Sequence, residues 1–159
     1  MIIREIQQHD NDAIEQIIKA ILNEFELPML GTVYEDKEIT SMYESYQLDS
    51  EIYYVIESER IVLGGGGIKH LRGFDDDVCE LQKMYFLPEI RGKGYGKLLF
   101  NKCLDTAKEM GYKRCYLESA SQLKVAIDIY EKRGFKHLDT PLGNTGHYSC
   151  GVWMIKDLI

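Results

Sequence analysis

The stretch "ELQKMYFLPEIRGKGYGKLLF", residues 80–100, decides the fold of this chain. Its first part belongs to an apolar run over residues 78–88 that predicts a long strand ended by Pro88. Its last part begins an apolar stripe that predicts a helix from about Gly94 to Met110. The turn between them leaves backbone amides unpaired at the positive end of the helix dipole. This turn is therefore predicted to bind an anion.

The turn has the composition that an anion site needs. Its three glycines carry no side chains that would keep a phosphate away from the amides. Arg91, Lys93 and Lys97 add positive charge to a chain whose net charge is −7. Because several amides converge there, a pyrophosphate fits this turn better than a single carboxylate.

Two known phosphate-binding motifs match this turn poorly. A Walker A loop needs Ser or Thr after its Gly-Lys pair, but Leu98 follows Lys97, and Arg91 takes the place of the first glycine. A dinucleotide fingerprint counted from Gly92 would need its third glycine at Lys97. Glu118, at the end of the next predicted strand, could still serve as the ribose-binding acid. A nucleotide-binding domain therefore stays open as an alternative, as does a tight loop without a ligand.

The rest of the chain predicts a mixed α/β order, in which helices cover a sheet. Helical apolar spacing and glycine stops predict helices over residues 12–25, 35–46, 94–110 and 123–133. Apolar runs between turn signals predict strands over residues 2–6, 52–58, 60–71, 78–88, 114–119, 135–138 and 149–155. The four glycines at 64–67 are unusual inside a strand and indicate either a bulge or the close approach of another backbone or a ligand.

Composition limits the partners. The 159 residues suffice for one domain, predicted over residues 1–159, with an ordinary globular composition. The chain has nineteen Lys and Arg against twenty-six Asp and Glu. This negative net charge repels nucleic acid and anionic membranes, so neither is expected as a partner. No apolar run reaches the roughly 18 residues of a membrane span, and "MIIREIQQHD" at the N-terminus has no signal-peptide core, so a cytoplasmic location is expected.

The four cysteines predict neither a metal site nor a redox motif. Cys79, Cys103, Cys115 and Cys150 are well separated, form no C-x-x-C pair and have no His at ligand spacing. Buried free thiols are the simpler interpretation. No base is expected beside any of them, so a covalent acyl-cysteine route is not favoured.

The stretch at 80–100, together with "AIDIYEKRGF" at residues 126–135, resembles the GNAT superfamily of N-acetyltransferases. Its shared motif, [RQ]-x-x-G-x-[GA], is matched by Arg91, Gly94 and Gly96. The resemblance covers residues 78–135 well and the N-terminal half only by element order. It implies an α/β fold with a mixed, mostly antiparallel central sheet of about six to seven strands flanked by about four helices. It also implies acetyl-CoA as cosubstrate and no metal.

The resemblance assigns expected roles along the chain. The pyrophosphate of acetyl-CoA would lie on the turn made by Arg91, Gly92, Lys93, Gly94, Tyr95, Gly96 and Lys97. The pantetheine arm and acetyl carbonyl would pair with the backbone of Met84, Tyr85 and Phe86, where the strand splays from its neighbour. Glu80 would act as general base through water, and Tyr130 as the acid that protonates the thiolate. A surface carboxylate for Glu80 and a packing residue for Tyr130 are the structural alternatives.

The acceptor is less well defined. The resemblance implies direct transfer, in a ternary complex, to a primary amine of a small molecule, amino acid or peptide. His147 and Tyr148 could line its pocket. Leu123 stands where relatives often carry an Asn that contacts the cofactor, so that contact is not expected. Homodimers are common in the family, and a homodimer is compatible with the sequence. A non-catalytic acyl-CoA-binding or nucleotide-binding module is the alternative function.

Overall fold

The computed structural model describes residues 1–27, 36–147 and 149–159. Its strands are β1 (Ile2–Glu5), β2 (Ile52–Ser58), β3 (Ile61–His70), β4 (Val78–Phe86), β5 (Arg114–Ala120), β6 (Lys136–Leu138) and β7 (Gly151–Asp157). Its α-helices are α1 (Asn11–Glu24), α2 (Tyr95–Glu109) and α3 (Lys124–Lys132). Short 3-10 helices are η1 (Gln8–Asp10), η3 (Lys37–Thr40), η4 (Glu44–Tyr46) and η5 (Pro88–Ile90). Within these residues, no helix has the length and apolar character needed to cross a bilayer.

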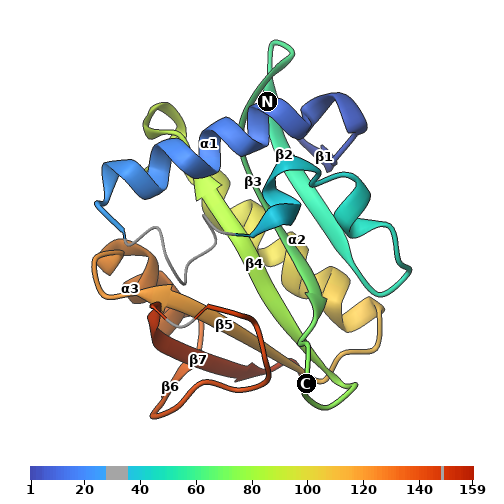
Figure 1. Cartoon of the computed structure of the whole chain (residues 1–159), viewed down its shortest axis with the longest axis vertical. Helices are drawn as coiled ribbons and strands as arrows, with labels where there is room; N and C mark the ends of the chain where they lie inside the picture. The colour runs from blue at the N-terminus through green and yellow to red at the C-terminus, as the bar shows by residue number, and fades with distance from the viewer. Residues whose placement is uncertain (28–35, 148) are drawn as a thin grey trace.

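The described strands form one seven-stranded sheet in the order β1-β2-β3-β4-β5-β7-β6. Neighbouring strands run antiparallel except β4 and β5, which are parallel. That parallel pairing joins only Val78 to Glu80 with Arg114 to Tyr116, after which the two strands diverge (Figure 1). The mixed, mostly antiparallel sheet expected from the sequence is confirmed, and the divergence opens a gap near its centre.

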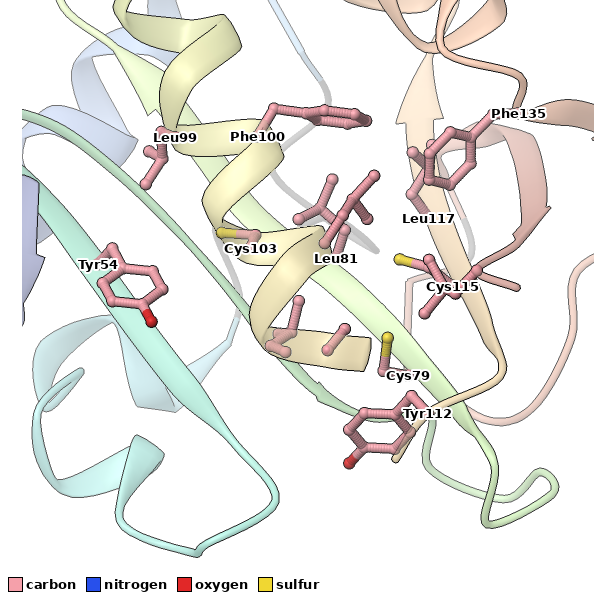
Figure 2. Close-up of a cluster of buried hydrophobic side chains, with 14 of the residues drawn as sticks. Tyr54, Cys79, Leu81, Leu99, Phe100, Cys103, Tyr112, Cys115, Leu117 and Phe135 are labelled. Carbon is pink, nitrogen blue, oxygen red and sulfur yellow. The ribbon is translucent and has the colours of Figure 1, made fainter. Parts of the chain in front are cut away.

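Helices α1 and α2 cover opposite faces of the sheet. Successive strand residues point to opposite faces, and Tyr53 packs in the core under α1 while Tyr54 packs in the core under α2. The α2 core includes Cys103 of the helix with Leu81 of β4 and Cys115 of β5 (Figure 2). The apolar stripes of both helices therefore form two separate cores, one on each side of β4.

Left-handed glycines end α2 and α3 in the same way. At the end of α3, Gly134 has φ 88°, its N–H donates to the Glu131 carbonyl at 3.0 Å, and the Phe135 N–H donates to the Tyr130 carbonyl at 3.0 Å. This is a Schellman motif, which usually brings the residue after the glycine against the last helical turn. The rings of Phe135 and Tyr130 lie 6.1 Å apart here. The "YEKRGF" sequence thus fixes the position of Tyr130.

The four-glycine run of β3 lies opposite a bulge in β4 and against the ring of Tyr53. The register between β3 and β4 shifts opposite Gly66, where Lys83 has φ 51°, which marks a bulge in β4. A β-carbon at Gly67 would lie 2.7 Å from the Tyr53 ring, so glycine is needed for that ring to lie across the strand. The Tyr53 hydroxyl then donates to the Lys83 carbonyl at 2.8 Å and holds the bulge.

The helix predicted over residues 35–46 is the main error of the sequence analysis. Residue 35 lies outside the described residues, and from residue 36 the chain forms the short helices η3 and η4. Ile39, Met42 and Tyr46 have helical spacing and are all buried, as the pattern required. Ser41, with φ −145° and ψ 54°, leaves the helical region and separates the two turns. The described chain therefore has three α-helices.

Candidate active site

The turn before α2 presents a row of exposed backbone amides. Gly92 and Gly94 have φ 73° and 88°, and α2 begins at Tyr95. Among the described residues, no backbone partner is recorded for the amides of residues 92–97, whereas the Leu98 N–H donates to the Gly94 carbonyl at 3.1 Å. Free N–H groups at a helix N-terminus attract anions. We call residues 92–97 the amide nest.

Glycine is required in this nest chiefly by backbone conformation. A β-carbon added at Gly92 or Gly94 would meet nothing within 4 Å, so space is not limiting, but their positive φ is strained for other residues. A side chain there would project into the approach to the amides. Gly96 differs, because its β-carbon would lie 3.3 Å from the Phe86 ring, which supports the first turn of α2.

The cations of the nest have different environments. The Arg91 Nη1 lies 2.7 Å from a Glu24 carboxylate oxygen at the end of α1, and its Nε donates to the Phe86 carbonyl at 2.9 Å. Arg91 therefore ties the nest to α1 and β4, and its charge is partly neutralised. Lys93 and Lys97 are exposed, and neither forms an ion pair with any of the described residues. These two lysines supply the nest with unpaired positive charge.

Beside the nest, the end of β4 has one edge that pairs with none of the described strands. Tyr85 and Phe86 pair with Gly65 and Gly64 of β3 on one side. On the other side β5 has already diverged, so the backbone over residues 84–86 faces the gap (Figure 1). The pairing with β5 stops at Glu80, so the stretch of β4 between Glu80 and the amide nest borders the region where the two strands diverge.

Glu80 is buried, so the surface alternative for this residue is wrong. Its side chain accepts a hydrogen bond from Gln82 Nε2 at 2.7 Å, and Gln82 Oε1 in turn accepts from the Tyr46 hydroxyl at 2.7 Å. Burial raises the pKa of Glu80 to about 7, with Glu118 adding to the rise and Gln82, Lys83 and His147 opposing it. A carboxyl with this pKa can both accept and release a proton near neutral pH.

Glu80 lines a cavity of about 70 Å³ on the α1 face of the sheet. Apolar walls and ionisable groups share it: the lining residues are Leu22, Leu27, Glu80, Leu81, Gln82, Lys83, Tyr85, Glu118, Ser119, Ala120, Leu123, His147 and Cys150. His147 therefore lies where the sequence suggested an acceptor pocket, whereas Tyr148 lies outside the described residues. Leu123 precedes α3 and contributes an apolar wall.

Ion pairs fix the charged side of this cavity. The Lys83 ammonium, 2% exposed, lies 2.5 Å from a Glu38 oxygen and 3.4 Å from an Asp36 oxygen. His147 Nε2 lies 2.9 Å from Asp36, and its Nδ1 lies 3.6 Å from Glu118. Burial opposes the imidazolium charge, but hydrogen bonds to Asp36, Cys150 and Glu118 outweigh it and raise the pKa of His147 to about 11. His147 is therefore protonated at neutral pH.

Tyr130 lies on the other face of the sheet, among the core residues under α2. Its ring stacks on Phe100 with centroids 5.8 Å apart, which agrees with the packing alternative. Burial raises the pKa of its hydroxyl to about 12, so the phenol stays protonated. Tyr85, which lines the cavity, interacts electrostatically with both Tyr130 and Cys150. The Tyr85 side chain packs with the α1-side core and so belongs to the same face as Glu80.

The arrangement of these parts has known counterparts. A model of the acetyltransferase (GNAT) family matches residues 15–135. The chain belongs to the GNAT family. It is 45% identical over 158 residues to the uncharacterized N-acetyltransferase YjgM of Escherichia coli K12, with 99% of this chain and 95% of that protein covered.

Solved GNAT structures share the fold. A GNAT acetyltransferase from Staphylococcus aureus Mu50 superposes with a TM-score of 0.82 at 21% identity, covering 99% of both chains. The protein yncA from Salmonella typhimurium, solved with its cofactor acetyl-CoA, has a TM-score of 0.77 at 23% identity, covering 100% of this chain and 94% of that one. GNAT membership makes the chain an N-acetyltransferase, and the nucleotide-binding alternative falls away.

The sequence analysis of this GNAT chain missed Gln82 as a site residue, and it named His147 without its partners. Gln82, which positions Glu80, shares its face by the period of two of a strand, so alternation along β4 could have indicated it. His147 and Cys150 are three positions apart, but their partners Asp36 and Glu118 are distant in sequence. Cys150 forms a hydrogen bond with His147, which the sequence did not indicate, but this imidazole is protonated and does not act as a base.

Proposed function

We propose that this GNAT enzyme transfers the acetyl group of acetyl-CoA to a small primary amine by direct attack in a ternary complex. The observation that carries the proposal is Glu80, a buried carboxyl with a pKa of about 7 that lines a cavity near the point where β4 and β5 diverge. The amide nest lies beyond the other end of β4. A thioester that enters between the strands would bring its carbonyl to the cavity.

The amide nest would hold the pyrophosphate of acetyl-CoA. The amides of residues 92–97, the dipole of α2 and the unpaired charges of Lys93 and Lys97 all favour a dianionic group. The backbone of Met84, Tyr85 and Phe86 would pair with the pantetheine arm. An N–H from this edge, directed at the acetyl carbonyl, would stabilise the oxyanion that develops during transfer.

Glu80 and Tyr130 would divide the proton transfers. An ammonium group cannot attack a thioester, so the acceptor must lose a proton, which Glu80 would take directly or through a water. The departing thiolate needs a proton, which the protonated Tyr130 hydroxyl would give from the α2 side of the gap. In this proposal the two groups would act from opposite faces of the sheet, because Glu80 lines the cavity on the α1 face and Tyr130 packs against the α2 core.

The acceptor would be small, at least at the end that reacts. The cavity of about 70 Å³ opens to the surface, so a small amine or the end of a longer molecule would fit in it. Its apolar side, from Leu22, Leu27, Ala120 and Leu123, would contact a short aliphatic segment. Glu80 and Glu118 give the opposite side carboxylates that attract an amine. A small-molecule amine, an amino acid or the amino end of a peptide would satisfy this geometry.

A panel of amines, each incubated with acetyl-CoA and monitored by the release of free thiol, tests the proposed function. We expect turnover with a subset of short primary amines and initial-rate patterns of a ternary complex. A ping-pong pattern would instead support an acyl-Cys150 intermediate, which we do not expect because His147 is protonated and cannot act as its base. Binding of acetyl-CoA without turnover of any amine would contradict the proposal and favour a non-catalytic acyl-CoA-binding module.

Replacing Tyr130 by Phe is expected to lower kcat by about 100-fold, the lower end of general-acid contributions. The affinity for acetyl-CoA should hardly change, because Phe keeps the stacking on Phe100 and the contact with Phe135. Tyr112→Phe is the matched control, since Tyr112 belongs to the same core and its hydroxyl donates to the Ser50 carbonyl. Equal kcat values for the two variants would remove Tyr130 as the acid.

A further inference from the structure

One wall of the cavity brings three different ligand types together. Glu118 of β5, His147 and Cys150 each offer one donor atom, and these atoms all lie within 4.8 Å of one another. His147 and Cys150 come from the chain that leads into β7, so two separate segments meet at this wall. A carboxylate oxygen, an imidazole nitrogen and a thiol sulfur form a donor set typical of zinc and related ions.

Outer hydrogen bonds orient two of these three side chains. His147 Nε2 lies 2.9 Å from both oxygens of Asp36, which leaves Nδ1 directed toward Glu118. The Glu118 carboxylate, 2% exposed, accepts from the Tyr116 hydroxyl at 2.8 Å and from Thr145 Oγ1 at 2.5 Å. Metal-binding His and carboxylate ligands characteristically have such partners, which fix the ring orientation and the ligand atom.

The position of Cys150 is the second indication of a ligand. The ion pairs of His147 with Asp36 and Glu118 are explained by charge alone, but they do not require a thiol. The other three cysteines are buried in the α2 core, whereas Cys150 is only partly buried and lines the cavity. A soft sulfur beside an oriented imidazole and an oriented carboxylate is what a late first-row ion selects.

We propose that Glu118, His147 and Cys150 bind a divalent late first-row transition ion, with Zn²⁺ as the best fit to this donor set. The thiolate and the carboxylate would balance the two charges of the ion, and the imidazole would bind as the neutral base. Binding would release the thiol proton and the imidazolium proton. Three protein ligands leave one tetrahedral position for a water or for a polar group of a molecule in the cavity.

Cobalt provides a direct test that needs neither acetyl-CoA nor an amine. The protein is first treated with a chelator and then titrated with Co²⁺, followed by Zn²⁺ to displace it. We expect a thiolate-to-Co²⁺ charge-transfer band and tetrahedral d–d bands that Zn²⁺ abolishes. The core thiols cannot produce this band, because Cys79, Cys103 and Cys115 lie within the apolar core. Absence of the band in the wild-type protein would overturn the proposal.

Variants then locate the ion. Cys150→Ser should remove the charge-transfer band, and Asp36→Asn should weaken Zn²⁺ binding by about 10- to 100-fold by loosening His147. His137→Ala is the matched control, because His137 also contacts a carboxylate, Glu131 at 2.6 Å, but on the exposed surface. The affinity of His137→Ala for Zn²⁺ should equal that of the wild-type protein. A charge-transfer band that persists in Cys150→Ser would place the ion elsewhere and contradict the proposal.

The metal proposal and the proposed function can fail separately. Zn²⁺ should raise the melting temperature of the wild-type protein and not that of Cys150→Ser, by mass action on the folded state. This readout also shows whether each variant is folded before the metal is added. Acetyl transfer by a wild-type protein that binds no metal would reject only the metal site. Metal binding without acetyl transfer would reject only the proposed function.

Discussion

Replacing Gly94 by Glu is expected to lower the affinity for acetyl-CoA by about 100-fold or more, which equals the loss of one or two charge-assisted hydrogen bonds. The β-carbon at this position meets no protein atom within 4 Å, so the new side chain would extend over the amide nest. Its carboxylate would repel the pyrophosphate and compete for the same amides. Isothermal calorimetry with acetyl-CoA measures the change.

Gly111→Glu is the matched control for this variant. Gly111 has φ 93° and open surroundings like Gly94, but it lies after α2, at the opposite end of the helix from the nest. Both variants carry the same charge and a similar backbone strain of about 1 kcal/mol. The affinity for acetyl-CoA should fall only in Gly94→Glu. Equal affinities in the two variants would show that the nest does not bind the cofactor.

Replacing Glu80 by Gln is expected to lower kcat/KM by about 100- to 1,000-fold at neutral pH, within the usual range for a general base. The wild-type rate should rise with pH through an inflection near 7, where Glu80 loses its proton, and the variant should lack that inflection. The profile is measured after chelator treatment, because a bound cation near Glu118 and His147 would shift the pKa of Glu80. Glu57→Gln, on β2, is the control and should keep the inflection.

Glu80→Gln should lower activity but raise the stability of the folded protein at neutral and higher pH. The folded protein holds the Glu80 proton up to about pH 7, while the unfolded chain loses it near the ordinary value of 4.5. Between these values the folded state binds more protons, so the free energy of unfolding of the wild-type protein falls as pH rises. Glu80→Gln removes this loss and should be more stable by up to about 3 kcal/mol above pH 7, from the free energy of that pKa difference.

Urea unfolding at about pH 4 and about pH 8 checks this consequence, because the two proteins should differ only at the higher pH. A variant that gains activity or keeps the inflection would remove Glu80 as the base. A variant with unchanged stability at both pH values would show that the Glu80 pKa is not raised in the folded protein. The two readouts therefore separate the catalytic role of Glu80 from its burial.

Much of the cofactor side of the site follows from local sequence. The glycines and cations of residues 91–97 lie beside a strand end and a helix start, so their chemistry needs no distant residue. The "YEKRGF" segment likewise contains the complete Schellman motif that places Tyr130. Local hydrogen bonding and apolar spacing determine the conformation of these parts, which the sequence predicted, whereas their roles in binding and catalysis stay predictions.

The acceptor side could not be predicted in the same way. His147 and Asp36 are 111 positions apart, and Glu118 meets Thr145 from another segment, so no sequence period connects them. The bulge at Lys83 depends on the Tyr53 hydroxyl and the glycines of β3, and a non-glycine residue with positive φ gives no local signal. The buried turns over residues 36–46 kept the apolar spacing of a helix without forming one.

A crystal structure with acetyl-CoA tests the central claim most directly. We expect the two phosphates within hydrogen-bonding distance of the amides of residues 92–97, and the thioester in the gap between β4 and β5, next to the cavity that Glu80 lines. Acetyl-CoA bound at another surface, with the amide nest making no contact to its phosphates, would contradict the account.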